Sequence, residues 1–157
     1  MRELVYHRQL LPTVERFADR EAFIDGEYRA TFGGHLDRVG RFAGGLRDLG
    51  VGSGDRFAVM ALNSHQYLEC YHAAFLGAGV INPLNLRLAP RELEYILADS
   101  GTKVCVTDAF FAPMIEQVRA AAGIEHVVMI GSGEAPHDHA YEDLLAAAAP
   151  VIPDEPE

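Results

Sequence analysis

Two hydrophobic patterns alternate along the chain from Arg56 onward. Four short, mostly apolar runs are typical of buried strands; they are Arg56–Ala61, Val80–Asn82, Lys103–Thr107 and His126–Ile130. The segments between them carry apolar residues at the three- and four-residue spacing of a helix. The resulting order, β-α-β-α-β-α-β, predicts an α/β fold with a mostly parallel sheet, helices on both faces and right-handed crossovers.

Helix ends and buried helix faces follow from the same pattern. The first long helix is expected to end at Gly50, and its inward face comprises Leu36, Val39, Phe42, Ala43, Leu46 and Leu49. The helix after the first strand is expected to begin at Asn63 or Ser64, with Tyr67, Leu68, Tyr71 and Phe75 facing inward. Pro90 and Gly101 bound a third helix, which buries Leu93, Ile96 and Leu97. Further helices are expected in "FFAPMIEQVRAAAG" and "YEDLLAAAA".

An N-terminal β-hairpin is predicted over residues 22–31, "AFIDGEYRAT". Asp25-Gly26 is a favoured two-residue turn, because glycine tolerates the positive φ that a type I′ turn requires. The expected architecture is therefore this hairpin followed by Rossmann-like βαβ units. Residues 1–149 form one domain in this interpretation, and the proline- and acid-rich residues 150–157 form a linker or tail.

The composition changes the picture only by exclusion. The 157 residues carry a formal charge of −10, whereas a nucleic-acid binder is usually basic, so we expect no nucleic-acid partner. No apolar run approaches the roughly 18–20 residues needed to span a bilayer. The charged N-terminus is unlike a signal peptide, and two cysteines are too few for a disulfide framework, so we expect a cytoplasmic protein.

Residues able to bind a metal or anion gather in the polar loop that follows the last strand. Glu134, His137, Asp138 and His139 could supply metal ligands, although an H-x-H pair in an exposed acidic loop is a weak pattern. Gly131–Pro136, "GSGEAP", follows a strand, but no helix opens at once, so a solvated loop is favoured over an anion site.

Other candidate residues also have plain structural explanations. Gly50–Asp55, "GVGSGD", follows a helix and opens a strand, the reverse of a dinucleotide-binding loop. His65 and His72 share a helix face but lack the spacing of the helical zinc motif. Turn, surface or helix-end positions account for four acidic residues, Asp25, Asp37, Asp55 and Asp99.

Neither cysteine is expected to be reactive. Cys70 and Cys105 have no basic neighbour in sequence, so we interpret both as small buried hydrophobes. No serine lies in a G-x-S-x-G elbow. The residues alone therefore assign no catalytic, cofactor-binding or metal-binding residue.

Segment order and local motifs nevertheless resemble one family over most of the chain, from about Pro12. "GVGSGDRFAVMALNS", "AAFLGAGVINPLN" and "LAPRELEYILADSGTKVCVTD" are similar, in this order, to the N-terminal part of the adenylate-forming enzymes. These enzymes include acyl-CoA synthetases, luciferases and nonribosomal-peptide adenylation domains, and "NPLNLRL" is more similar to the acyl-CoA synthetase branch. At the first long helix, Phe32-Gly33-Gly34-His35 replaces the Tyr-x-Glu-Leu common in the family, which weakens that helix start.

The resemblance implies an enzyme that uses ATP, Mg²⁺ and coenzyme A to convert a fatty or aromatic carboxylic acid into its thioester. The family's phosphate loop, adenine- and ribose-binding motifs and catalytic lysine have no counterpart in these 157 residues. We therefore expect a scaffold fragment that is not catalytically competent alone, and a homodimer through apolar surface that truncation exposes. Arg87 and Arg91 lie either near a coenzyme phosphate or simply on the surface.

A different class of function stays open at this point. The same pattern suits a stand-alone α/β ligand-binding or interaction module, whose pocket would lie beyond the carboxyl ends of the strands. That module predicts saturable ligand binding by the chain itself.

Overall fold

A computed structural model describes residues 6–152 of the chain. Over this range the polypeptide forms six helices: α1 (Tyr6–Phe17), α2 (Phe32–Asp48), α3 (His65–Phe75), α4 (Pro90–Ser100), α5 (Ala112–Ala122) and α6 (Tyr141–Ala147). The strands of the same range are β1 (Glu21–Asp25), β2 (Tyr28–Thr31), β3 (Arg56–Met60), β4 (Val80–Pro83), β5 (Val104–Asp108), β6 (His126–Ile130) and β7 (His139–Ala140). No helix within residues 6–152 is both long and apolar enough to cross a bilayer.

The central sheet confirms the predicted α/β class. Its five strands lie in the order β4-β3-β5-β6-β7, and every neighbouring pair is parallel. The two-residue strand β7 was not predicted. Its two residues, His139 and Ala140, pair with Val128 and Met129 of β6. So short a strand leaves no period-2 pattern in the sequence.

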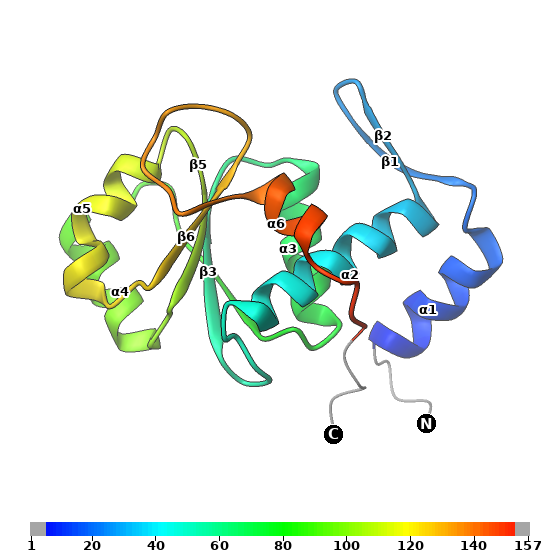
Figure 1. Ribbon diagram of the computed structural model, residues 1–157, viewed down its shortest axis with the longest axis horizontal. Coiled ribbons are helices and arrows are strands. Elements are labelled where there is room, and N and C mark those ends of the chain that lie inside the picture. The colour runs from blue at the N-terminus through cyan, green and yellow to red at the C-terminus, as the bar shows by residue number, and fades with distance from the viewer. Residues whose placement is uncertain (1–5, 153–157) are drawn as a thin grey trace.

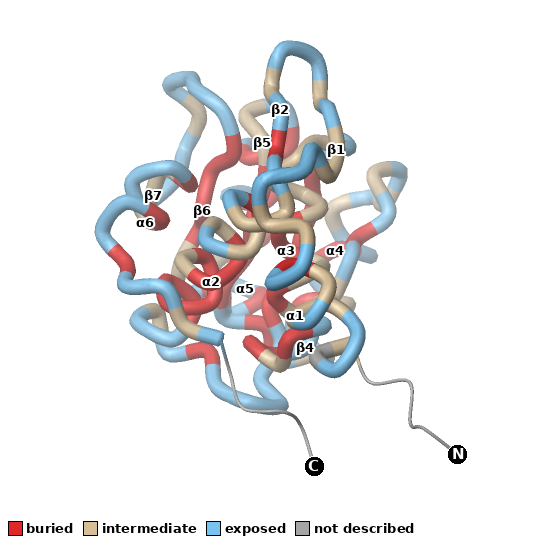
Figure 2. The backbone as a smooth tube through the Cα atoms, turned by 90° about the vertical axis from the view of Figure 1, so that its right-hand side faces the viewer, coloured by how far each residue is buried: buried red, intermediate tan, exposed pale blue. Residues whose placement is uncertain are grey.

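Helices cover both faces of this sheet, which separates the core into two layers (Figure 1). Phe57 and Val59 of β3 pack with α2, α3 and α6, whereas Ala58 and Met60 pack with α4 and α5. Side chains alternate across a strand, so each strand contributes to both layers. Figure 2 shows the buried segments running through the sheet and α2, with the tip of the β1–β2 hairpin exposed.

The hairpin is confirmed, but its turn is displaced by one residue from the predicted position. Asp25 pairs with Tyr28, so the two central residues are Gly26 and Glu27 rather than Asp25 and Gly26. Of these two residues, only Gly26 has a positive φ, 57°. Glu27 has none, since no described non-glycine residue has a positive φ. A turn with positive φ at its first central residue alone is closer to type II′ than to type I′.

The predicted inward face of α3 is wrong except for Tyr67, which is partly buried and packs against the core. Glu69, Cys70 and Ala73 are buried, whereas Phe75 is 49% exposed and Tyr67 and Tyr71 are half-buried. The small side chains of Cys70 and Ala73 allow α3 to pack closely against α2 and the sheet, a place that bulky aromatic rings would not fit. The aromatic side chains instead form a row with centroids 5.3 Å (Tyr67–Tyr71) and 6.0 Å (Tyr71–Phe75) apart.

Helix ends follow the sequence more closely. The Thr31 hydroxyl accepts a hydrogen bond from the Gly34 N–H at 3.0 Å, so α2 begins at Phe32 despite the two glycines that follow. The Ser64 hydroxyl, rather than Asn63, caps α3 by accepting from the Tyr67 N–H at 3.2 Å. Gly101 ends α4 in the left-handed conformation, with φ 62°, as predicted.

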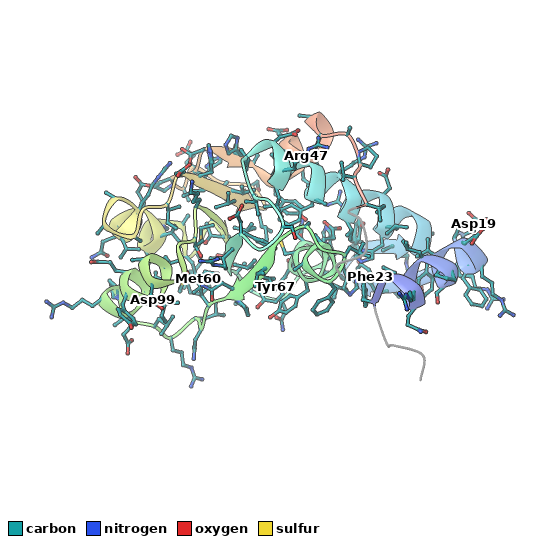
Figure 3. All side chains as sticks on the ribbon, turned by 90° about the horizontal axis from the view of Figure 1, so that it is seen from below. Asp19, Phe23, Arg47, Met60, Tyr67 and Asp99 are labelled. Atoms are coloured by element: carbon teal, nitrogen blue, oxygen red, sulfur yellow. The ribbon has the colours of Figure 1, made fainter. Side chains whose placement is uncertain are left out.

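Helix α1 and the hairpin lie at one end of the molecule. Figure 3 places Asp19, which follows α1, at the opposite end from Asp99 of α4. Near the chain end, the Val151 N–H donates to the Gly40 carbonyl of α2 at 2.9 Å. The division into residues 1–149 and 150–157 stays a prediction, and residues 153–157 lie outside the described range.

Candidate functional site

The carboxyl ends of β3 and β5 meet at the topological switch point of the sheet. The chain passes from β3 to β4 on one side, and then crosses back to β5 on the other side of β3. Helix α3, which follows β3, packs on one face, and α5, which follows β5, packs on the opposite face. The loops after β3 and β5 therefore diverge, and ligands of open α/β sheets bind in the crevice that such divergence creates.

Asp108, the last residue of β5, joins the two diverging loops. One carboxylate oxygen accepts the Leu62 N–H of the β3–α3 loop at 2.9 Å. The other accepts the N–H groups of Phe110 and Phe111 at 3.0 and 3.2 Å. Three backbone donors thus occupy the carboxylate, so Asp108 holds the edge together rather than presenting a free general base.

Exposed apolar side chains border this edge. Leu62 is 59% exposed and Phe110 is 79% exposed, and both are neighbours of Asp108 through the hydrogen bonds above. The β6–β7 loop approaches the same region, since a Cβ on Gly133 would lie 3.4 Å from the Ala109 Cβ. The edge is therefore an apolar rim suited to contact with an apolar ligand or with further polypeptide.

The densest charged cluster lies beneath the hairpin, where α2, α3 and α6 meet. The Arg38 guanidinium donates to Glu69 at 2.6 and 3.2 Å and to Glu142 at 2.8 and 2.9 Å. The Tyr141 hydroxyl donates to the second Glu69 oxygen at 2.9 Å. The Glu69 side chain is fully buried, so the arginine and this hydroxyl replace the water that would otherwise hydrogen-bond its oxygens.

The pKa shifts in this cluster follow from burial and pairing. Burial opposes the Arg38 charge, but hydrogen bonds to Glu142 and Glu69 outweigh it and raise the pKa of the guanidinium. Hydrogen bonding to Arg38 lowers the pKa of Glu142. Burial raises the pKa of the Tyr141 hydroxyl well above its usual value, and nearby Cys70 and Glu69 add to the effect. The cluster is therefore a satisfied ionic link between three helices, with no group left free to transfer a proton.

A pair of histidines, His35 buried and His72 partly buried, adds to the polar contacts between α2 and α3. The His35 Nε2 and His72 Nδ1 atoms lie 2.6 Å apart, and His35 is 5% exposed with its Nδ1 atom unpartnered. Burial lowers the pKa of His35 to about 4, with smaller contributions from nearby positive charge, and burial also lowers the pKa of His72. Both imidazoles are thus neutral at pH 7 and join the helices as a neutral hydrogen-bonded pair.

The sequence did not predict these two groupings. Glu69 lies on the same helical stripe as Cys70 and Ala73, and a carboxylate on a buried stripe is a signal that a cation must reach it. The choice of Arg38 as that cation requires the packing of α2 on α3, which separates the partners by 31 residues in sequence.

The two histidines proposed on one face of α3 have different partners. His72 joins the pair with His35, whereas His65 donates its backbone N–H to Asp25 at 2.8 Å and places its Nδ1 atom 3.0 Å from the same carboxylate. These hydrogen bonds from His65 lower the pKa of Asp25. His65 therefore attaches the hairpin to α3, and it also stacks on Tyr28 with 3.8 Å between ring centroids.

The candidate metal residues of the β6–β7 loop are separated by other contacts. Asp138 accepts from Arg119 at 2.7 Å and from the Val127 N–H at 2.8 Å, and these bonds outweigh its desolvation and lower its pKa. His137 bonds the Ala135 carbonyl at 2.7 Å, while His139 lies beside His126. Within residues 6–152, no group of three or more His, Cys, Asp or Glu side chains is placed to hold a metal ion.

The glycine-rich turn and the remaining acidic candidates are structural. In Gly50–Asp55 the Asp55 carboxylate accepts the Gly52 N–H at 2.9 Å, which closes a tight turn into β3. Asp37 pairs with Arg41 at 2.8 Å, and Asp99 is exposed on α4. The Gly131–Pro136 segment is a largely exposed loop.

Both cysteines are free and fully buried, as predicted. Burial raises the pKa of the Cys105 thiol to about 12 and that of Cys70 well above its usual value. Neither thiol is therefore a nucleophile at neutral pH.

The arginines considered for a coenzyme phosphate lie on the surface. Arg87 and Arg91 are both exposed, and Arg91 borders an open hollow of about 460 Å³ on α4 together with Leu88 and Tyr95. A second hollow, of about 180 Å³, lies near the amino ends of β3 and β4, where Arg47 and Ser53 border it. Neither hollow lies at the switch point.

A parallel sheet with helices on both faces and a switch point between its first strands defines a doubly wound α/β protein. The chain belongs to the AMP-binding enzyme family, because the sequence model of that family matches residues 11–156. This family is the adenylate-forming one that the sequence motifs resemble.

Individual relatives agree with this assignment. The chain is 36% identical to a long-chain-fatty-acid–CoA ligase of Thermus thermophilus over 80% of its own length and 23% of that enzyme. It is 26% identical to a 3-hydroxybenzoate–CoA ligase of Aromatoleum over 92% of its length and 28% of that enzyme. A solved fatty acyl CoA synthetase of Mycobacterium tuberculosis superposes with a TM-score of 0.80 at 26% identity, covering 94% of this chain and 29% of the other.

The chain thus spans about a quarter of the length of the relatives that it matches. Family and fold are established by these similarities.

Proposed function

We propose that this chain is the N-terminal scaffold of an ATP-dependent acyl-CoA synthetase and is not catalytically competent by itself. The family match and the fatty-acid and aromatic-acid ligases among its relatives support this class of reaction. The substrate would be a fatty or aromatic carboxylic acid, with ATP and coenzyme A as co-substrates. A cytoplasmic location and self-association of the chain stay predictions.

The proposed reaction has two balanced steps. A carboxylate oxygen of the acid attacks the α-phosphorus of ATP, and the bond to pyrophosphate breaks, which leaves an acyl-adenylate. The sulfur of coenzyme A then attacks the acyl carbonyl, loses its proton and expels AMP. Activation as the adenylate is needed because a free carboxylate is a poor electrophile.

The scaffold role rests on how the polar side chains of the helix contacts and of the switch point are paired. Arg38, Glu69 and Tyr141 engage one another in a cluster that links three helices. At the switch point, Asp108 is likewise occupied by backbone N–H groups. These contacts stabilise the fold and leave the acid–base chemistry of the proposed reaction to residues elsewhere in the whole protein.

Magnesium is implied by the family, but the described residues do not fit it. No group of three His, Cys, Asp or Glu side chains in residues 6–152 is placed to hold a metal, and Asp138 is taken by Arg119. We therefore assign no residue of this chain to Mg²⁺.

A pyrophosphate-release assay tests the proposal. The 157-residue chain and the whole protein that contains it are each given ATP, Mg²⁺, coenzyme A and either a fatty acid or benzoate. The proposal expects acid-dependent pyrophosphate release from the whole protein and none above background from the chain. Acid-dependent release by the isolated chain would contradict the scaffold role, and failure of the whole protein with every acid would contradict the ligase activity.

A further inference from the structure

Two histidines outside the polar clusters described above lie side by side at the edge of the sheet. His126 begins β6 and His139 begins β7, and these two strands are paired in parallel. The His126 Nδ1 and His139 Nε2 atoms are 3.3 Å apart, with ring centroids separated by 5.3 Å. Both side chains are partly exposed, so a solute can reach them.

The separation of the two nitrogens is long for a hydrogen bond and suitable for a shared metal ion. Hydrogen bonds from N–H groups have donor–acceptor distances of about 2.7–3.2 Å. Zinc binds histidine nitrogen at about 2.0–2.1 Å in tetrahedral geometry, which places two such nitrogens about 3.4 Å apart. The observed separation of 3.3 Å is close to this spacing.

Neighbouring contacts hold the starts of β6 and β7 together. Asp138, next to His139, accepts the Val127 N–H at 2.8 Å and the Arg119 guanidinium at 2.7 Å. The Asp138 N–H in turn donates to the Val127 carbonyl at 2.9 Å. Residues adjacent to each histidine are thus fastened to each other, which reduces the loop ordering that binding would otherwise require.

The chemistry of the pair selects the class of ion. Imidazole nitrogen suits Zn²⁺, Cu²⁺ and Ni²⁺, whereas Mg²⁺ prefers oxygen ligands. No third His, Cys, Asp or Glu of the described residues joins the pair, so water would complete the coordination.

We propose that His126 and His139 form a two-histidine site for a borderline divalent cation, with Zn²⁺ as the reference ion. The bound ion fastens the short strand β7, and with it the β6–β7 loop and the start of α6, to β6. The site does not depend on the proposed ligase reaction, because imidazole nitrogen suits a borderline ion, whereas Mg²⁺ prefers oxygen ligands.

Metal titration of the EDTA-treated chain tests this site. Isothermal calorimetry with ZnCl₂ is expected to give one ion per chain, and the ion should raise Tm, whereas MgCl₂ should do neither. His126→Asn and His139→Asn are each expected to weaken Zn²⁺ binding at least 10-fold. His137→Asn is the matched control, since His137 is exposed in the same loop and bonds only the Ala135 carbonyl, and it should bind as the parent chain does.

Electron paramagnetic resonance with Cu²⁺ provides a second readout that does not depend on stability. Nitrogen couplings from two imidazoles are expected in the parent chain and from one in either single variant. Absence of binding would overturn the proposal, as would equal loss in all three histidine variants, which would indicate an adventitious ion only. Couplings that are unchanged in both His126→Asn and His139→Asn would also overturn it.

Discussion

Arg38 is the residue on which the packing of three helices depends most directly. It is the only guanidinium among the described contacts that pairs with two carboxylates on two other helices, Glu69 of α3 and Glu142 of α6. A buried ion pair adds little net stability, because desolvation offsets the attraction. Removal of one partner is different, since it leaves the other charge buried and unpaired.

Replacement of this arginine is therefore expected to be costly. Arg38→Ala should lower the free energy of unfolding by about 3–5 kcal/mol, because Glu69 loses its counter-charge while fully buried. Urea denaturation monitored by circular dichroism measures the change. Arg29→Ala is the control, since the Arg29–Glu21 pair is exposed and should cost less than about 1 kcal/mol.

A double variant separates charge from shape. Arg38→Met combined with Glu69→Met removes both charges, and it should be less destabilising than Arg38→Met alone. Equal losses in the single and double variants would contradict an unpaired Glu69 as the cause.

At the scale of elements, the neutral pair of His35 and His72 makes the contact between α2 and α3 sensitive to acid. The pKa of His35 is lowered from 6.5 to about 4 in the folded chain. The unfolded chain therefore binds more protons between these two values. The stabilisation from this histidine is present in full above pH 6.5, and it is lost as the pH falls toward 4.

This linkage predicts a measurable pH dependence. Between pH 7 and pH 5 the parent chain should lose about 2 kcal/mol of unfolding free energy through His35, given its folded pKa of about 4. Thermal or urea unfolding at the two pH values measures the loss. His35→Gln should lose less stability over the same interval, whereas His137→Asn should behave as the parent chain. An identical pH dependence in the parent and His35→Gln chains would contradict the assignment.

Elements with long or continuous patterns could be predicted from the sequence. The strands β3, β5 and β6 are buried on both faces, which produces the apolar runs that identify them. The helix caps at Ser64 and Gly101 could also be predicted, because each depends on the residue type at one position of the local backbone. The order of these elements was enough to predict a parallel sheet.

Features that depend on tertiary packing were not predictable in the same way. Aromatic residues at helical spacing on α3 indicated an inward face, but Cys70 and Ala73 face inward because only small side chains fit there. Helix α1 went unpredicted although Leu10, Val14 and Phe17 have helical spacing, because Pro12 inside it is a residue that usually interrupts a helix. The pairs Arg38–Glu69 and His35–His72 join residues 31 and 37 positions apart, so no local pattern reveals them.

At the scale of the whole molecule, residues 6–152 have a two-layer core and an apolar rim at the switch point. Leu62 and Phe110 remain exposed there, and Phe75 remains exposed on α3. The same chain spans about a quarter of the relatives that it matches. Scaffold and chemistry are thus divided in our account, with residues 6–152 supplying the scaffold.

Calorimetric titration of the 157-residue chain with Mg²⁺-ATP, and then with coenzyme A and a fatty acid, tests this division most directly. We predict no saturable heat with any of the three, because the proposed scaffold role leaves the binding of these substrates to residues elsewhere in the whole protein. Saturable binding of Mg²⁺-ATP by this chain would contradict the account, and it would favour a stand-alone ligand-binding module instead.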